Sequence, residues 1–458
     1  MPPDPDPILL PLPNSLPPVE RVARMPVGFA AVGTTAGIKA SGRPDFALVV
    51  STDGPVPAAA VFTPNRFAAA PVRLSRANLR ETGGTSDACG YAAAVIATSG
   101  SANAATGPDG DADQAAIGQA VADAIGTTPA NVLHLSTGVI GTRLPVGRVT
   151  AAIKRVTDEG LEYTDLALGQ AAVSLRTTDS TTKMASVTVK LPTPHGGTVA
   201  VAVTGIAKGV GMIHPRMATM LSIVLTDATV SPTQLRTLLR GAAAVTWDQL
   251  SVDGDTSTND TVFALASGGA GAVSADDDPG ARATLAAAIK AVARDLARQQ
   301  ARDGEGADAL LTCQVSGAAV DADARAVARA VISSSLVKAA VHGKDANWGR
   351  IAGAAGNALV AEAQVLEAAG LSPDEAASRA SKPAAVDPAL MKIAIAGHLA
   401  YDGSAGGPTG IDKAAARESM TTDEVVIRLD LGLGRGTGEA FGCPLTEAYV
   451  RENSEYTT

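Results

Sequence analysis

The segment of residues 205–221, GIAKGVGMIHPRMATML, concentrates side chains that could do chemistry. It follows an alternating apolar stretch that is typical of a β-strand, and its glycines surround a single lysine, Lys208. The His214-Pro215 step favours an extended turn, and Thr219 then begins another apolar run. A flexible, cationic loop directly before a threonine that heads a buried strand directs attention to the peptide bond in front of that threonine.

Thr219 would become an effective nucleophile if that peptide bond were cut. A threonine at a new N-terminus carries a hydroxyl and an adjacent α-amine, and the amine can act as the base for the hydroxyl. An α-amino group, with an ordinary pKa of about 7.7–8.0, is a better base near neutral pH than a lysine side chain, with about 10.4. Spacing alone, however, favours the plainer interpretation that this threonine opens a strand because of its β-propensity.

Other candidate sites are weaker. The run DGDTSTND, residues 253–260, fails as an EF-hand calcium loop because Thr258 and Ala264 occupy the positions that need glycine and a carboxylate, so we interpret it as an Asx-rich turn. The glycine run of residues 432–438 lacks the third glycine of a dinucleotide fingerprint. The five histidines are isolated from one another, and the three cysteines contain no CxxC pair. The sequence therefore predicts no metal and no cofactor.

The overall composition excludes several classes of protein. The chain has 458 residues and a formal charge of −9, with 18% charged and 3% aromatic residues, so it offers neither a basic stripe nor an aromatic platform for nucleic acid. No uncharged apolar stretch reaches the length of a membrane span. Residues 1–25 are proline-rich and acidic without a basic start, which predicts a disordered tail and not a secretory signal. We expect a cytoplasmic, globular protein.

The elements that must position these residues come in blocks. Apolar alternation around TPHGG predicts a hairpin of residues 186–192 and 198–206, and the run 219–230 predicts a buried strand that ends at a helix start around Ser231. One-sided apolar stripes predict helices over 280–302 and 321–343. Further runs predict strands, which are 46–52, 92–99, 309–317 and 424–434, and a helix over 111–126. Hairpins and helices in blocks favour a layered α+β design over a parallel doubly wound sheet.

Several motifs, taken together and in order, resemble the ornithine acetyltransferase family, whose members cleave themselves and act in the acetylated pathway to arginine. The usual family form of the opening loop is KGSGMIHPNMATML. The resemblance runs from about Pro26 to Thr458, and the motifs that carry it are STGVIG (136–141), TTD (177–179), GIAKGVGMIHPRMATML (205–221), VDGDTSTNDT (252–261), DGEGA (303–307), LVKAAVHGKDANWGRI (336–351) and the terminal YVRENSEYTT.

The resemblance implies a role for each matching residue. It implies a cut between Ala218 and Thr219, which leaves an α-chain (26–218 after the tail) and a β-chain (219–458) with Thr219 as its N-terminal nucleophile. Thr137 and Gly138 correspond to the oxyanion-hole pair, which stabilises the negative oxygen of a tetrahedral intermediate. The positions that match substrate contacts are Thr177, Lys208, Thr219, Glu305, Asn453 and Thr458.

The implied reaction is a ping-pong transfer of an acetyl group from N2-acetylornithine to glutamate through an acyl-threonine, with no cofactor. Residue chemistry fits these roles, since Lys208 suits a carboxylate and Glu305 an ornithine ammonium. We assign proton transfer to the Thr219 amine and binding to Lys208. A second reaction that makes N-acetylglutamate from acetyl-CoA would need a thioester site that the sequence does not reveal.

The implied fold is a layered α/β helix-sheet-sheet-helix sandwich, of the self-processing aminopeptidase and ornithine acetyltransferase type, with a smaller C-terminal α/β lobe. The implied assembly is an α2β2 heterotetramer or larger. Some positions depart from the family pattern, namely Val210, Arg216, His342 and Pro444. Three alternatives therefore stay open: a paralogue that exchanges acetyl groups between related amino acids in specialised, clavam-like metabolism, an unprocessed amino-acid-binding protein, and an aminopeptidase-like enzyme, for which the nucleophile would ordinarily be serine.

Overall fold

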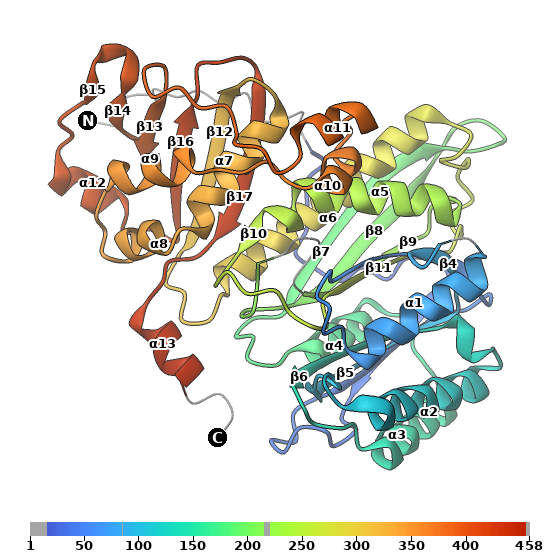
Figure 1. Cartoon of the computed structure of the whole chain (residues 1–458). Helices are drawn as coiled ribbons and strands as arrows, with labels where there is room; N and C mark the ends of the chain where they lie inside the picture. The colour runs from blue at the N-terminus through green and yellow to red at the C-terminus, as the bar shows by residue number, and fades with distance from the viewer. Residues whose placement is uncertain (1–15, 85, 215–219, 455–458) are drawn as a thin grey trace.

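Two lobes make up the structure, a computed structural model that describes residues 16–84, 86–214 and 220–454 (Figure 1). The first lobe holds two β-sheets with helices against their faces, and the C-terminal lobe holds a third sheet with its own helices. The predicted class, a layered α/β fold with a C-terminal α/β lobe, is confirmed.

A six-stranded sheet forms the centre of the first lobe. Its strands, in spatial order, are β4 (Cys89–Ala92), β3 (Val56–Phe62), β11 (Thr261–Ala266), β9 (Leu221–Thr226), β8 (Thr198–Lys208) and β7 (Lys183–Pro192). β9 and β11 are parallel, and the other neighbours are antiparallel. β7 and β8 form the predicted hairpin, with Lys183 opposite Ala207 at its open end. This open end brings the chain to Lys208.

Two helices cover the outer face of this sheet, α5 (Pro232–Val245) and α6 (Pro279–Arg302). The Ser231 hydroxyl accepts a hydrogen bond from the amide of Gln234 and so caps α5 at the predicted start. The predicted apolar stripe of α6 is buried against the sheet, and its residues are Leu285, Ile289, Val292 and Leu296. Burial of this stripe, at about 25 cal/mol per Å² of apolar surface, fixes the helix on the sheet.

The second sheet of the first lobe has four strands. In spatial order they are β1 (Phe29–Thr34), β2 (Phe46–Ser51), β5 (Ala94–Ser101) and β6 (Val132–Val139). Helices α2 (Gly107–Ile125) and α3 (Val146–Glu159) pack on its outer face. Two further helices, α1 (Ala70–Gly83) and α4 (Asp165–Leu175), share one apolar core with the inner faces of both sheets. The predicted helix-sheet-sheet-helix order therefore contains an additional helical layer.

The C-terminal lobe is built on a seven-stranded sheet. Its strands, in spatial order, are β10 (Leu250–Ser251), β17 (Gly436–Gly442), β12 (Leu310–Ala318), β16 (Glu424–Asp430), β13 (Lys392–Ile395), β14 (His398–Asp402) and β15 (Gly407–Pro408). Its helices are α7 (Asp321–Ser333), α8 (Ser335–His342), α9 (Trp348–Gly356), α10 (Ala363–Ala368), α11 (Pro373–Arg379), α12 (Lys413–Ser419) and α13 (Glu447–Ser454), and short 3-10 turns elsewhere are η1 (Pro129–Asn131), η2 (Trp247–Gln249) and η3 (Gly403–Ala405).

One predicted helix was wrong in its extent. Residues 321–343 form two helices, α7 and α8, and the break lies at Ser334, which is extended and whose hydroxyl caps α8 by accepting from Val337 N. Serine hydroxyls compete for backbone hydrogen bonds, and three serines in succession weaken a helix at this point. The break allows the buried Lys338 Nζ to donate to the carbonyl of Cys443 at 2.8 Å.

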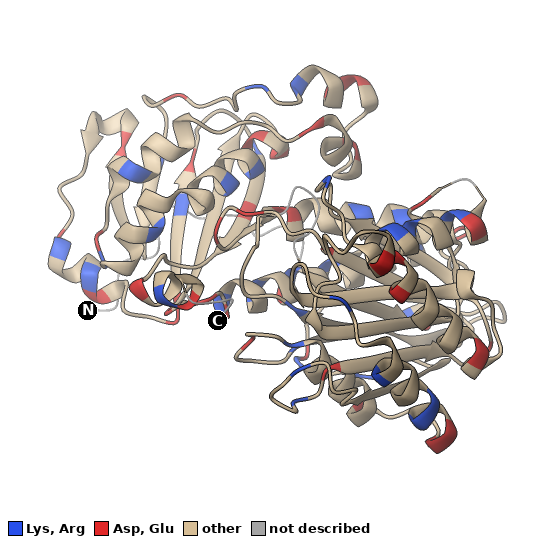
Figure 2. Ribbon diagram, turned by 60° about the horizontal axis from the view of Figure 1, so that its bottom comes forward, with Lys and Arg blue, Asp and Glu red and all other residues tan. Residues whose placement is uncertain are grey.

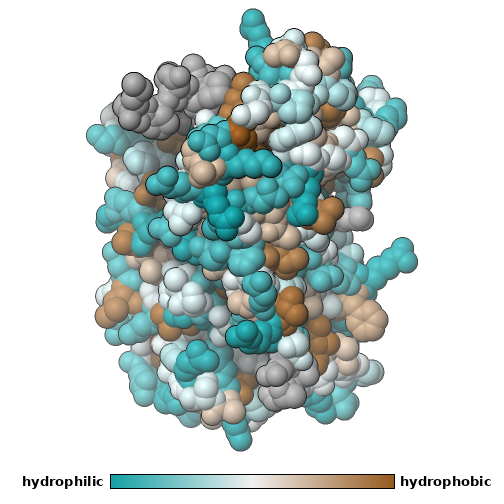
Figure 3. Space-filling view, turned by 90° about the vertical axis from the view of Figure 1, so that its left-hand side faces the viewer, coloured by the Kyte–Doolittle hydropathy of each residue, from teal (hydrophilic) through white to brown (hydrophobic). Residues whose placement is uncertain are grey.

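Some of residues 16–25, which were predicted to belong to a disordered tail, make contacts with the first lobe. Glu20 pairs with Ser186 at the edge of β7, and Leu16 and Val19 pack against the core under α6. Basic and acidic side chains are interspersed over both lobes (Figure 2). On the face in Figure 3, apolar side chains form small scattered patches among polar ones. Within the described ranges, we find no helix whose length and apolarity would carry it across a bilayer.

Candidate active site

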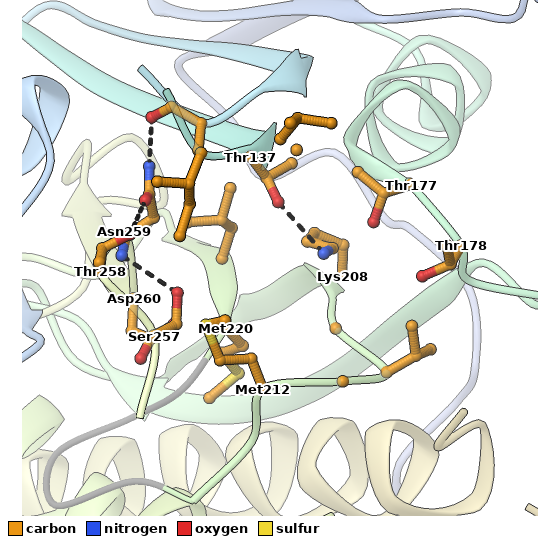
Figure 4. A pocket seen from close by; sticks show the side chains of 18 of the residues that line it. Thr137, Thr177, Thr178, Lys208, Met212, Met220, Ser257, Thr258, Asn259 and Asp260 are labelled. Atoms are coloured by element: carbon orange, nitrogen blue, oxygen red, sulfur yellow. Dashed lines mark hydrogen bonds between the residues drawn. The ribbon is translucent and has the colours of Figure 1, made fainter. Parts of the chain in front are cut away.

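A pocket of about 390 Å³ lies where the first lobe meets the C-terminal lobe. The end of β6, the turn after α4 and the end of β8 supply one side, and the 257–260 loop supplies another (Figure 4). Glu305, after α6, and Asn453, on α13, complete the lining. Segments that are far apart in sequence therefore converge on one small volume.

This pocket collects most of the residues predicted to act together. Those that line it are Thr137, Gly138, Thr177, Lys208, Glu305 and Asn453. Ala218, Thr219 and Thr458 lie outside the described residues. Met220, which follows Thr219 in the chain, lines the pocket, and its carbonyl accepts a hydrogen bond from Thr261 N at 2.8 Å.

Lys208 supplies a cationic group to the pocket. It is the last residue of β8, and its Nζ donates to the hydroxyl Oγ1 of Thr137 at 3.2 Å (Figure 4). Its carbonyl accepts a hydrogen bond from the buried Gln300 amide at 2.9 Å. The lysine is 9% exposed, so its ammonium faces a largely enclosed volume, where a carboxylate would be a favourable partner.

Gly138 must be a glycine for steric reasons. Its φ is +133°, and a Cβ at this position would lie 2.3 Å from the carbonyl carbon of Gly100 on the neighbouring strand. β5 and β6 are parallel here, with Gly100 opposite Gly138. The close approach of the two strands therefore holds the Thr137-Gly138 backbone at the rim of the pocket in one conformation.

Glu305 supplies a carboxylate whose two oxygens are both held. Thr178 Oγ1 donates to Oε1 at 3.1 Å, and Asn453 Nδ2 donates to Oε2 at 3.0 Å. The amide of Glu305 donates to the carbonyl of Val210 at 2.8 Å. A Cβ on Gly211 would lie 2.2 Å from Oε2, so this glycine leaves the space that the carboxylate occupies. The pocket thus presents a fixed cation and a fixed anion.

Asp179, the last residue of the TTD motif and one for which no role was predicted, links the binding segments. Its Oδ1 accepts from Gly209 N at 2.8 Å and from Lys183 Nζ at 2.7 Å, and its Oδ2 accepts from Thr177 N at 3.0 Å. Burial opposes its charge, but Lys208 and Lys183 hold the pKa of Asp179 below its ordinary value. Lys183 also pairs with Asp303 at 2.5 Å. One buried carboxylate therefore positions Thr177 and the residue after Lys208.

Asn259 is a second residue of the site for which no role was predicted from the sequence. Its Nδ2 donates to the carbonyls of Ala102 at 2.6 Å and Ser136 at 2.8 Å, so it joins the loop before β11 to β6, the strand that carries Thr137. Thr258 Oγ1 donates to Asn259 Oδ1 at 2.6 Å. The signal was the motif VDGDTSTNDT itself, because an asparagine in an Asx-rich turn is typical of backbone bridging.

The predicted Asx turn is present in the same motif. Asp253 Oδ1 accepts from Asp255 N at 3.1 Å and from Ile213 N at 2.8 Å, and its Oδ2 accepts from Met212 N at 2.5 Å. Met212 has a φ of +54°, which is uncommon for a residue with a side chain. The carboxylate of Asp253 therefore stabilises a strained conformation in the segment that precedes residues 215–219. Among the described residues, we find no cluster of three or more histidine, cysteine or acidic side chains that could hold a metal ion.

Comparison with known proteins identifies close relatives over nearly the full chain. The arginine biosynthesis bifunctional protein ArgJ of Thermosynechococcus vestitus is 44% identical over 436 residues, which cover 94% of this chain and 96% of the relative. The ArgJ protein of Thermus thermophilus is 39% identical over 437 residues, which cover 95% of this chain and 99% of the relative.

A solved structure of ornithine acetyltransferase from Mycobacterium tuberculosis, complexed with ornithine, is also similar. It is 36% identical, with a TM-score of 0.38, and the match covers 44% of this chain and 99% of that chain. The sequence model of the ArgJ family matches residues 30–458. A match of this length, together with relatives at about 40% identity over more than nine-tenths of their sequences, shows that this chain belongs to the ArgJ family.

Proposed function

We propose that this protein is a glutamate N-acetyltransferase of arginine biosynthesis that cleaves itself between Ala218 and Thr219. The observation that carries the proposal is the convergence of Thr137, Gly138, Lys208 and Glu305 on one pocket that Met220 also lines. Cleavage would make Thr219 a new N-terminus one residue from Met220. The names of the relatives, which place them in arginine biosynthesis, support the same assignment.

In maturation, the Thr219 hydroxyl would attack the carbonyl carbon of Ala218. The C–N bond breaks as the hydroxyl oxygen forms an ester, the nitrogen becomes the α-amine of Thr219, and water then hydrolyses the ester to a carboxylate on Ala218. The products are the chains of residues 1–218 and 219–458. The same hydroxyl and the new amine then serve in turnover.

In turnover, the Thr219 hydroxyl would attack the acetyl carbon of N2-acetylornithine. The α-amine takes the hydroxyl proton and passes it to the departing nitrogen, so ornithine leaves and an acetyl-threonine remains. The amine of glutamate then attacks this ester, and the products are N-acetylglutamate and the free hydroxyl. We assign Thr137 and Gly138 to the stabilisation of the oxyanion in both halves, a contribution of about 3–4 kcal/mol for one donor in other enzymes.

The charges of the pocket fit the shared and differing parts of the two substrates. Both substrates carry an α-carboxylate, which we assign to Lys208, and only ornithine carries a side-chain ammonium, which we assign to Glu305. Thr177 and Asn453 complete the substrate contacts, together with Thr458, which lies outside the described residues. Because Glu305 is already held by Thr178 and Asn453, its carboxylate needs little reorganisation to bind an ammonium.

A second activity deserves testing, because the relatives are named as bifunctional proteins. Acetyl-CoA could acetylate the same threonine, after which transfer to glutamate would follow the same second half. We also propose that the cleaved chains assemble as an α2β2 heterotetramer in the cytoplasm.

Denaturing mass spectrometry of the purified protein tests the cleavage directly. We expect two chains that meet at Ala218 and Thr219, and one uncleaved chain for Thr219→Ala, which should also be inactive. The activity assay offers N-acetylornithine with glutamate in one arm and acetyl-CoA with glutamate in the other. An intact, inactive wild-type chain that still binds these amino acids would support the alternative of a binding protein, and hydrolysis of unblocked peptides would support an aminopeptidase.

A further inference from the structure

A second pocket, of about 360 Å³, lies where α7 of the C-terminal lobe faces α10 and η2. Figure 1 shows α7 against the sheet of the C-terminal lobe, and α10 between that lobe and α5. One face of α7 lines the pocket with Arg325, Arg329 and Ser333, which are spaced four residues apart and so lie above one another. None of these residues belongs to the active site described above.

Arg325 is the central observation. Its Nη2 is buried and has no hydrogen-bond partner among the residues that the structure describes. Burial lowers the pKa of its guanidinium, and Asp321, one turn earlier, opposes this shift. The carboxylate of Asp321 accepts a hydrogen bond from Thr437 N at 2.8 Å. A guanidinium remains charged in proteins, so a buried N–H group of it that has no partner is costly unless an acceptor joins it.

Two other polar atoms that line the pocket share this lack of a partner. Ser333 Oγ and Gln249 Oε1 are buried and, within the described part of the chain, have no hydrogen-bond partner. Buried polar atoms without partners are few in native proteins, and their concentration at one cavity indicates a molecule that completes them. The donors lie on α7, while Gln249 offers an acceptor from η2. Asp248 and Glu362 also line the pocket, so its charge is mixed.

We propose that this cavity is a second ligand site, which binds a small molecule with a carboxylate or phosphate group. The anionic group lies against Arg325, Arg329 and Ser333, and a hydrogen-bond donor of the same molecule faces Gln249 Oε1. A guanidinium matches the geometry of either anion, so the structure assigns the charge class and leaves the choice between carboxylate and phosphate to the experiment.

The site adjoins the segment that leads to the predicted cleavage position. His214 lines this second pocket, and Met212, two residues earlier, lines the active pocket. The carbonyl of His214 accepts from Thr256 Oγ1 at 2.9 Å, which ties the segment to the 253–260 turn. A ligand in the second pocket therefore lies next to a short segment that is shared by both pockets.

The test measures binding by isothermal titration calorimetry and by thermal unfolding, in a buffer free of phosphate and carboxylates. Inorganic phosphate and succinate are the two probes. For the wild type we expect saturable binding of at least one probe and a rise in Tm. Lys208→Met alters the active pocket and not the second pocket, so this variant should retain both the binding and the rise in Tm. Arg325→Gln should lose at least ten-fold in affinity and most of the Tm rise. Without any anion, its Tm should equal or exceed that of the wild type, because a guanidinium with an unsatisfied buried N–H group has been removed.

Arg417→Gln on α12 is the matched control, since it removes an exposed arginine from the same lobe and should behave as the wild type. If Arg325→Gln does not fold, Arg329→Gln and Ser333→Ala replace it, with weakened binding expected in each. Equal affinity for the probes in the wild type and in these variants, or no binding of either probe to the wild type, would overturn the proposal.

Discussion

The two pockets at the junction of the lobes are similar in size, about 390 and 360 Å³, but differ in how their charged groups are held. In the active pocket, Lys208 and Glu305 have partners within the protein, and Asp179 fixes the segments around them. In the second pocket, Arg325 Nη2 is buried without a partner in the described chain. The difference separates a site whose charged groups are held by the protein from one that contains a buried guanidinium nitrogen without a hydrogen-bond partner in the described chain.

Asp179→Asn should break the organisation of the active pocket most severely. It leaves Lys183 with one carboxylate in a buried cluster, and loss of one member of such a cluster typically costs about 3–5 kcal/mol. We expect the unfolding free energy to fall by about 3 kcal/mol and activity to fall more than ten-fold. Urea unfolding in a Thr219→Ala background keeps a single chain. Asp423→Asn, at an ion pair whose aspartate side chain is 95% exposed, should change stability by less than about 0.5 kcal/mol. Equal effects at both positions would contradict the role of Asp179.

Gly138→Ala tests whether close strand approach is needed at the rim. The new Cβ would meet the Gly100 backbone at 2.3 Å, so the Thr137-Gly138 segment must shift. A displaced oxyanion donor should lower kcat by about 10²–10³. Gly141→Ala is the control, because Gly141 also has a positive φ, +84°, but nothing lies within 4 Å of its Cβ position. If both variants lose the same activity, backbone strain and not the clash is responsible.

Glu305→Gln removes the negative charge of the carboxylate while keeping the shape of the side chain. A hydrogen bond to a charged group contributes about 1.5–3 kcal/mol, so KM for N-acetylornithine should rise roughly 10- to 100-fold, with a smaller effect on KM for glutamate. Steady-state kinetics with each substrate varied in turn measures this split. Glu452→Gln, beside Asn453 on α13 but outside the pocket lining, should leave both KM values near those of the wild type. An equal rise for both substrates would contradict the assignment of Glu305 to the ammonium.

A smaller, pH-dependent effect on stability is expected from His134, which lies on β6, the strand that carries Thr137 and Gly138. Burial lowers the pKa of His134, on β6, to about 3 from an ordinary 6.5, and its Nδ1 lies 2.9 Å from the Gln114 amide. Below pH 6.5 the unfolded chain therefore binds a proton that the folded chain excludes, so the stability contributed near pH 7 is lost on acidification. From pH 7 to pH 5 this loss amounts to about 2 kcal/mol. In His134→Gln, the stability lost between pH 7 and pH 5 should be smaller by that amount. His195→Gln, at an exposed histidine, should leave the loss unchanged. A slope that is unchanged in His134→Gln would show that this histidine titrates normally.

The local sequence pattern predicted which segments form helices and strands better than it predicted where a helix breaks. The hairpin before Lys208 and the apolar stripe of α6 follow from periodicities of two and 3.6 residues, and the structure confirms both. The break at Ser334 was missed because the apolar stripe continues across it, and the contact of Lys338 with Cys443 that accompanies the break is a long-range one. Pattern in one segment carries no information on a partner that is about a hundred residues away.

In the candidate site, too, some residues were predicted from the sequence and others were not. Family motifs directed attention to Thr137, Lys208 and Glu305, and the structure brings them to one pocket. The supporting residues Asp179 and Asn259 were not assigned roles, because an acidic or amide side chain in a turn usually satisfies its own backbone. Only the three-dimensional arrangement shows that Asp179 joins Thr177 to Gly209.

The order of strands in the six-stranded sheet has a consequence for the cleaved protein. Strands β11 and β9 come from residues after 219, and they lie between β3 and β8, which come from residues before it. The two products of cleavage would therefore be interleaved within one sheet, and neither could leave without rupturing hydrogen bonds on both sides of that central pair. Two separately made fragments would have to fold around each other rather than dock as finished halves, whereas a single precursor brings all the strands of this sheet into one folding event.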